Sequence, residues 1–214
     1  KIAFVGQNGE GKSTLAKIMV GDLEAIGLMK LGHNVQIGYF AQNQAEFLDG
    51  KKTVLDTMID AANETNRSKV RDILGSFLFQ GDDVDKYVRV LSGGERNRLA
   101  LAKMLLQPFN VLVMDEPTNH LDIKSKNVLK QALRNFDGTL VLVSHDRMFL
   151  DQITNRTIEI IQKKIFDFKK SYSEYLVFRE ELRENQISAL KNQVKFIQNT
   201  EKLIEKFRAK ASKA

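Results

Sequence analysis

The stretch GQNGEGKS, from Gly6 to Ser13, has residue types and a spacing that suit phosphate chemistry. It fits the pattern GxxxxGK followed by Ser or Thr, and it lies between the apolar run KIAFVG and a segment of helical pattern. In such a loop the glycines let backbone N–H groups surround phosphates, the lysine reaches the β and γ phosphates, and the hydroxyl binds Mg²⁺. The alternative is a chance match in a loop without function. We expect a nucleotide to be bound by Gly6, Asn8, Gly9, Gly11, Lys12, Ser13 and Thr14.

Two adjacent carboxylates follow the apolar run NVLVM. Asp115 ends that run, where an unpaired carboxylate is costly to bury, and Mg²⁺ held by Ser13 would be a suitable partner. Glu116 comes next, where it can orient or deprotonate a water that attacks the γ phosphate. The alternative is a strand that simply ends in an acidic turn. Together with the phosphate loop, the pair predicts a metal ligand at Asp115 and a base at Glu116.

An alternation of strands and helices must position these groups. The apolar runs KIAFVG, NVQIGYF, NVLVMDE, GTLVLVSH and RTIEII alternate with helical patterns up to about Ile161, and FDFKK adds a last strand. This order is typical of an α/β domain with a mostly parallel sheet, the arrangement of a P-loop nucleoside triphosphatase. Because such sheets gather ligands at the carboxyl ends of their strands, the phosphate loop and the two carboxylates should meet there.

Composition limits the remaining choices. The chain has 214 residues, 43% of them hydrophobic, which suggests one globular domain with an appendage. No apolar run reaches the roughly 20 residues that span a bilayer, and no leader precedes the first strand, so we expect a soluble, cytoplasmic chain without a transmembrane segment. The sequence has no Cys, which excludes disulfides and thiolate metal sites and suits a reducing compartment.

A second stretch, LSGGERNRLALAK from Leu91 to Lys103, has the form of a turn that opens a helix. Ser92 could cap that helix, and a Gly pair follows it. A helix start of this kind is a second place where an anion could bind.

The end of the chain differs from the rest. Gly and Pro are absent after Tyr175, and Ile187, Leu190, Val194, Ile197 and Ile204 recur with 3,4 spacing, so we expect a long amphipathic helix. Glu201 and Arg208 interrupt the apolar stripe. A helical hairpin arm and a solvated helix packed on its own domain are both compatible with the pattern. The net charge of +6 is concentrated in this tail, at Lys202, Lys206, Arg208, Lys210 and Lys213.

Four stretches in order, GQNGEGKST, LSGGERNRLALAK, VLVMDEPTNHLD and LVLVSHD, resemble an ATP-binding cassette domain over roughly residues 1–159. SGGE and DEPTNHLD are similar in particular to the F subfamily, whose soluble members act on ribosomes. The stretch NTEKLIEKFRAKASKA resembles the helical linker between the two cassettes of that subfamily, which approaches the P-site tRNA. The resemblance divides the chain into a cassette at 1–170, with a helical signature subdomain at about 53–105, and a linker or arm at 171–214.

The resemblance also implies roles for residues. Cassettes pack head to tail, so that Ser92, Gly93, Gly94 and Glu95 would close over ATP and Mg²⁺ bound by a second cassette, in cis or in trans. Gln42 would be the Q-loop residue near the metal and the attacking water, Asp122 the D-loop acid at the cassette interface, and His145 the switch histidine at the γ phosphate. We expect His33 and His120 to be structural.

Departures from the family pattern are also visible. The chain begins at the strand that leads into the phosphate loop, so the aromatic residue that stacks on adenine has no counterpart. IIQKKIF lacks the Gly that usually makes the turn between the last strands. Residues up to about 146 resemble the second cassette of these proteins and the remainder the end of the first, so we expect either a fragment or a junction of segments near Ser144 to Arg147.

Three functions remain open on the sequence alone. The first is an ATPase that acts on the ribosome in translation, with its basic tail on ribosomal RNA or tRNA. The second is the nucleotide-binding subunit of a membrane transporter, which shares the catalytic motifs. The third is a nucleotide-gated binding module without turnover.

Overall fold

The computed structural model describes residues 1–41, 43–119 and 121–211, with side chains described up to 202 and at 204. Gln42 and His120 therefore lie outside the described residues. The chain forms two compact units, Lys1–Tyr172 and Ser173–Ala214.

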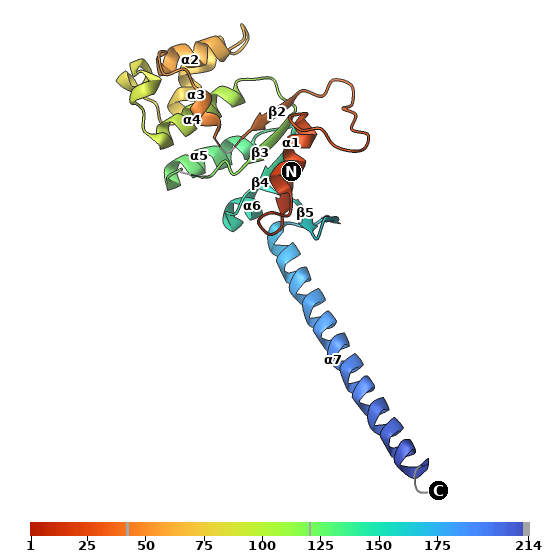
Figure 1. The fold of residues 1–214 in the computed structure, drawn as a ribbon. Coiled ribbons are helices and arrows are strands. Elements are labelled where there is room, and N and C mark those ends of the chain that lie inside the picture. Colours follow the sequence, from red (N-terminus) through yellow and green to blue (C-terminus); the bar gives the residue numbers. More distant parts are fainter. Residues whose placement is uncertain (42, 120, 212–214) are drawn as a thin grey trace. The chain divides into compact units, whose positions relative to one another are not determined.

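A six-stranded sheet forms the centre of the first unit (Figure 1). Its strands are β1 (Ile2–Val5), β2 (Ile37–Phe40), β3 (Val111–Asp115), β4 (Thr139–Val143), β5 (Arg156–Ile161) and β6 (Lys164–Phe168). They lie in the order β2-β3-β4-β1-β5-β6, in which every pair is parallel except β5 with β6. The predicted fold class, a mostly parallel α/β sheet of the P-loop type, is confirmed.

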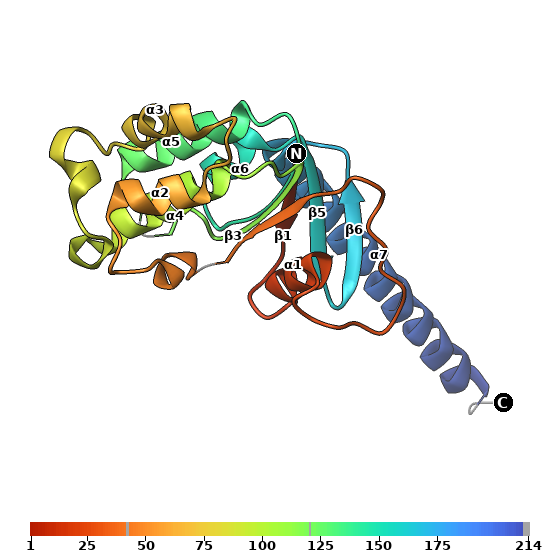
Figure 2. The ribbon, with the colours of Figure 1, turned by 90° about the horizontal axis from the view of Figure 1, so that it is seen from above.

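Helices cover both faces of the sheet (Figure 2). On one face, α1 (Lys12–Val20) buries Ala16 against Phe4, Val141 and Val143. The other face carries α5 (Ile123–Arg134) and α6 (Arg147–Ile153), whose apolar side chains are buried. Because successive strand residues point to opposite faces, strands covered on both sides must be apolar throughout, which accounts for the continuous runs in the sequence.

The turn between β5 and β6 is made without glycine. Gln162 and Lys163 both have positive φ, at 49° and 61°. Two consecutive positive φ values are what a tight hairpin turn requires, and most residues adopt them only at a cost. The family's missing Gly is thus replaced by two strained residues at the same place.

A group of helices lies beside the sheet (Figure 1). It comprises α2 (Val54–Ala61), α3 (Val70–Ser76), α4 (Gly93–Leu105) and the short 3₁₀ turns Arg67–Lys69, Gly81–Asp85 and Val88–Val90. A further 3₁₀ turn, Gln44–Phe47, precedes them. Buried side chains of Val54, Met58 and Leu74 give the group a core of its own.

The segment in which a junction is expected is packed and hydrogen-bonded. Ser144 is buried, and Asp146 caps α6 by accepting the Phe149 N–H at 3.1 Å. No peptide bond from Ser144 to Arg147 is cis and no φ there is positive, and the expected junction stays a prediction.

The second unit is a single helix. Helix α7 runs over Tyr172–Ala211, so the described part of the chain does not contain the second, antiparallel helix of a helical hairpin. Ile187, Leu190, Val194 and Ile197 are all more than 40% exposed within their own unit. Among the described residues, none of the helices has both the length and the apolar character needed to cross a bilayer.

Candidate active site

The loop between β1 and α1 depends on its glycines. Gly6, Gly9 and Gly11 have φ values of 149°, 85° and 99°, which other residues rarely adopt. A Cβ at Gly6 would also lie 2.3 Å from the carbonyl oxygen of Ile160 on β5, whereas a Cβ at Gly9 would meet nothing within 4 Å. The loop can therefore keep this path only with glycine at its first position.

Lys12 begins helix α1 and folds back over the loop. Its side chain is buried, and its Nζ donates to the carbonyl oxygens of Gly6 and Gln7, both at 2.9 Å. Gly11 at the helix N-cap provides no side-chain acceptor for the first N–H groups. A buried ammonium and uncapped N–H groups at one helix start suit the binding of phosphates.

Asp115 and Glu116 stand at the carboxyl end of β3. Asp115 is buried, at 5% exposure, and Glu116 has a positive φ of 50° that is fixed by its N–H, which donates to the Val143 carbonyl at 2.8 Å. This backbone turn directs the Glu116 side chain toward the loop after β4. There the Glu116 Oε2 accepts a hydrogen bond from the backbone N–H of His145 at 3.3 Å.

The Glu116 carboxylate is only partly satisfied. Its Oε1 is buried, lies 3.7 Å from His145 Nε2, and has no hydrogen-bond partner among the described residues. Burial raises the pKa of Glu116, an effect that the hydrogen bond and charge of His145 only partly offset. A buried carboxylate oxygen with a spare lone pair and a raised pKa has the properties of a general base.

One cavity of about 430 Å³ brings these groups together. Its walls come from the phosphate loop, the start of α1, the end of β3 and the loop after β4: Asn8, Gly9, Gly11, Lys12, Ser13, Thr14, Asp115, Glu116, Asn119 and His145. Asn119 is a further member of this set that was not predicted, although its place three residues after Glu116 in DEPTN was a usable indication. Gly6 lines a neighbouring cavity of about 250 Å³ with Lys12 and His145.

The residues present fit a bound Mg²⁺. The described residues contain no group of three or more His, Asp or Glu side chains that could hold a metal on their own. The Ser13 hydroxyl and the buried Asp115 carboxylate line the same cavity, and oxygen atoms of this kind suit Mg²⁺ when phosphate oxygens complete the set. Gln42, the third expected ligand, lies outside the described residues.

The predicted signature residues lie elsewhere. Ser92 caps α4 in a reciprocal capping box, in which its hydroxyl accepts the Glu95 N–H at 3.3 Å and the Glu95 carboxylate accepts the Ser92 N–H at 2.7 Å. The Ser92 hydroxyl also donates to the Glu95 carboxylate at 2.6 Å, and this bond, followed by the one from the Ser92 N–H, lowers the pKa of Glu95. None of the residues from Ser92 to Glu95 lines the phosphate-loop cavity.

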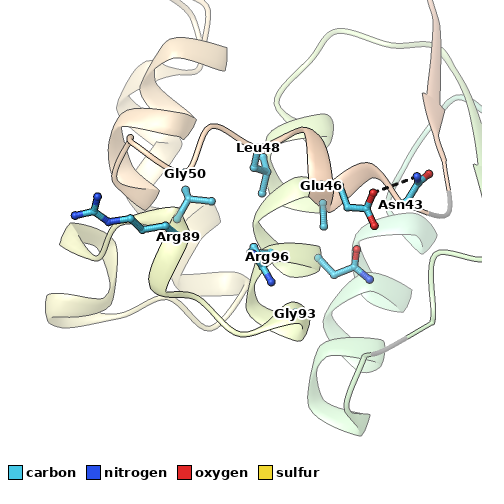
Figure 3. Close-up of a pocket in the computed structure, with 10 residues that line it drawn as sticks. Asn43, Glu46, Leu48, Gly50, Arg89, Gly93 and Arg96 are labelled. Atoms are coloured by element: carbon cyan, nitrogen blue, oxygen red, sulfur yellow. Dashed lines mark hydrogen bonds between the residues drawn. The ribbon is translucent and has the colours of Figure 1, made fainter.

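Instead, the start of α4 borders a different cavity of about 740 Å³ (Figure 3). Its opposite wall is the segment after β2, where Asn43 donates to Glu46 at 3.4 Å. Gly93 and Arg96 belong to the α4 side of this cavity. The signature motif therefore lies outside the cavity of its own chain's phosphate loop.

Asp122 and the histidines complete the predicted set. Asp122 caps α5 by accepting the Ser125 N–H at 2.7 Å, and its side chain is 61% exposed. Hydrogen bonding from the Ser125 side chain, and then from the Ser125 N–H, lowers the pKa of Asp122. His145 is also largely exposed at the cavity rim. His33 lies on an exposed segment far in sequence from these residues, and no role for it emerges.

Two family models match the chain, each with the description ABC transporter, over residues 1–119 and 158–214. "ABC transporter F family member 5" of Arabidopsis thaliana is 47% identical over 178 residues, which is 82% of this chain and 26% of that protein. "ABC transporter F family member 2" of the same plant is 43% identical over 189 residues, 87% of this chain and 28% of that protein. The chain thus spans little more than a quarter of these relatives.

A solved structure is also similar. It is the complex of "archaeal ribosomal stalk protein aP1 and archaeal ribosome recycling factor aABCE1". The match has a TM-score of 0.58 and 27% identity, and it covers 74% of this chain and 31% of that one.

Proposed function

Because the chain belongs to the ABC transporter family of ATP-binding domains, we propose that it binds ATP with Mg²⁺ and hydrolyses it in the cavity between the phosphate loop and Glu116. The observation that carries the proposal is the meeting of four elements at this cavity. Lys12, Asp115, Glu116 and His145 come from segments far apart in sequence and line it together.

Each side chain has a distinct task in this proposal. Lys12 and the N–H groups at the start of α1 bind the phosphates. Ser13 and Asp115 would hold Mg²⁺, which would neutralise charge on the phosphate oxygens. Glu116 orients the attacking water and accepts its proton through the buried Oε1, and His145 stands beside it to contact the γ phosphate.

The hydrolysis experiment is a substitution of the base. Glu116→Gln keeps the shape of the side chain but cannot accept a proton, so turnover should fall by roughly 10²–10⁴-fold while ATP affinity is retained. Phosphate release and equilibrium ATP binding are measured side by side, with Asp137→Asn as a control on a carboxylate outside the cavity. Undiminished phosphate release in Glu116→Gln would remove Glu116 from the role of base.

A second cassette completes the site in this proposal. This part of the proposal is supported by the absence of Ser92, Gly93, Gly94 and Glu95 from the lining of their own phosphate-loop cavity and by the exposure of Asp122, as expected of groups that act on a partner's nucleotide. A mixture of Lys12→Ala and Ser92→Arg chains can form one intact composite site per heterodimer, because both lesions fall in the other. Activity restored by mixing supports the trans arrangement; full activity in either single variant contradicts it.

The cellular role that we propose is action on the ribosome. Two relatives bear the F family name, and a structural relative is a ribosome recycling factor in complex with a ribosomal stalk protein. The basic tail, whose side chains beyond 204 lie outside the described part, is the proposed contact with RNA phosphates. Co-purification with ribosomes supports this role, and co-purification with a membrane subunit would favour the transporter function instead.

The tail can be tested by salt dependence. If about four basic side chains contact phosphates, log affinity falls with log salt at a slope near −3 to −4, which is on the order of 10²-fold between 50 and 200 mM. Replacing Lys206, Arg208 and Lys210 by Glu should flatten this slope and leave ATP affinity unchanged. Equal RNA affinity and an equal salt slope in the triple variant and the parent would mean that the tail is only a solvated helix.

A further inference from the structure

The loop that carries His145 is tied down on both sides. On one side, Ser144 Oγ lies 3.2 Å from Thr118 Oγ1, both residues being buried, and it accepts the Asp146 N–H at 3.1 Å. On the other side, Asp146 Oδ2 accepts from Lys126 Nζ at 2.8 Å. His145 is therefore held between a tie to the segment after Glu116 and a tie to helix α5.

Lys126 also belongs to the first turn of α5. Its N–H donates to the Asp122 carbonyl at 2.9 Å, in the first turn of the helix, so it lies directly above the exposed N-cap residue. One side chain thus reaches from the turn that begins at Asp122 to the residue next to His145. His145 in turn donates its N–H to Glu116.

The Lys126–Asp146 pair is poorly placed to serve stability alone. The two side chains are 36% and 26% exposed, and ion pairs accessible to solvent contribute only about 0–1 kcal/mol. Asp146 also caps α6 with its other oxygen, Oδ1, so its two oxygens hold two different elements. Such a bridge is suited to fixing the position of the loop between them.

We propose that Lys126 and Asp146 are positioning residues for hydrolysis, which couple the Asp122 turn to His145 and Glu116. The inference rests on the proposed function, in which Asp122 lies at the surface that meets a second cassette. Movement of the first turn of α5 on closure is passed through Lys126 Nζ to the Asp146 carboxylate. The backbone of His145 follows, and with it the hydrogen bond to Glu116.

The experiment removes the Lys126–Asp146 ion pair and keeps the N-caps of α5 and α6. Lys126→Met deletes the cation, and Asp146→Asn keeps an oxygen at the α6 cap but removes the charge. Each should lower kcat by about 2- to 30-fold, the range of measured couplings through such networks, with KM for ATP and Tm nearly unchanged. Lys126→Arg should restore turnover, and the double variant should be no slower than the slower single variant.

Two controls separate position from other effects. Lys124→Met removes an exposed lysine from the same helix turn, and it should turn over like the parent. Glu116→Gln proteins with and without Lys126→Met should assemble equally in an ATP-dependent sedimentation run, because the pair acts after closure.

The possible results distinguish a failure of this inference from a failure of the proposed function. If the parent hydrolyses ATP and Glu116→Gln abolishes turnover, but Lys126→Met and Asp146→Asn retain the parent's rate, the inference is wrong and the proposed function stands. Multiplicative losses in the double variant, a parallel fall in Tm, or an equal loss in Lys124→Met would also overturn it. A parent that releases no phosphate, whatever its partner, overturns the proposed function together with the inference.

Discussion

The steric requirement at Gly6 gives a prediction that does not depend on any ligand. In Gly6→Ala, the new Cβ would lie 2.3 Å from the Ile160 carbonyl oxygen, a backbone atom of β5 that cannot move away as a flexible side chain could. Gly9→Ala places a Cβ where nothing lies within 4 Å. Both substitutions impose a positive φ on alanine, which costs about 1–3 kcal/mol. Only the first adds an overlap with the sheet.

The overlap can be estimated from the response of packed interiors. Forcing extra atoms into such a region costs about 1–3 kcal/mol, and that is the expected difference in free energy of unfolding between Gly6→Ala and Gly9→Ala. For a chain of this size, each kcal/mol lowers Tm by roughly 2–4 °C, so the two variants should differ by roughly 2–12 °C.

Thermal unfolding without nucleotide, followed by circular dichroism, measures this difference directly. ATP binding by both variants shows whether the loop path is lost in Gly6→Ala and kept in Gly9→Ala. Equal Tm values for the two variants would mean that β5 does not confine the loop, and the geometric argument for the first glycine would fail.

Further predictions concern pH, capping and the core. Burial raises the pKa of Glu116 above its ordinary value of 4.5. Ionisation of Glu116 therefore lowers the stability of the folded protein, by nothing below pH 4.5 and by more as the pH rises above it. Glu116→Gln removes this ionisation and should raise Tm more at pH 7 than at pH 4. Ser92→Ala breaks the capping box and should lower the free energy of unfolding by about 0.5–2 kcal/mol in urea, with Ser92→Thr as the control that keeps a cap. Leu142→Ala, fully buried in β4, should cost about 2–5 kcal/mol in the same assay; a loss under 1 kcal/mol would contradict its place in the core.

Most of the fold could be predicted from the sequence because the strands are covered on both faces. An apolar run such as NVLVM allows few other structures, and the phosphate-loop pattern fixes the strand before it and the helix after it. The last hairpin was harder to predict from the sequence. Strand β6 begins at Lys164, before the FDFKK stretch, because Gln162 and Lys163 form a turn that is unusual for their residue types.

A site residue could be predicted from the sequence only where its chemical type and its position in a known motif indicated the same role. Lys12, Asp115 and Glu116 have types that their positions demand. Asn119 was missed although its place after Glu116 in DEPTN gave an indication. The Lys126–Asp146 ion pair could not be inferred, because a lysine is ordinary in a sequence and its role depends on a distance between segments far apart in the chain. The roles proposed for Ser92 and Asp122 remain predictions, since they depend on a second cassette.

The two hydrogen bonds of Lys12 bear on how a common experiment is interpreted. A phosphate group competes with the Gly6 and Gln7 carbonyls for the same ammonium, so nucleotide affinity reports an exchange of partners and not a newly made contact. Lys12→Ala removes the nucleotide contact and also the two hydrogen bonds that join the start of the loop to α1. The fall in affinity of that variant therefore sums two effects, and only the second should appear as faster hydrogen exchange in the loop when no nucleotide is added.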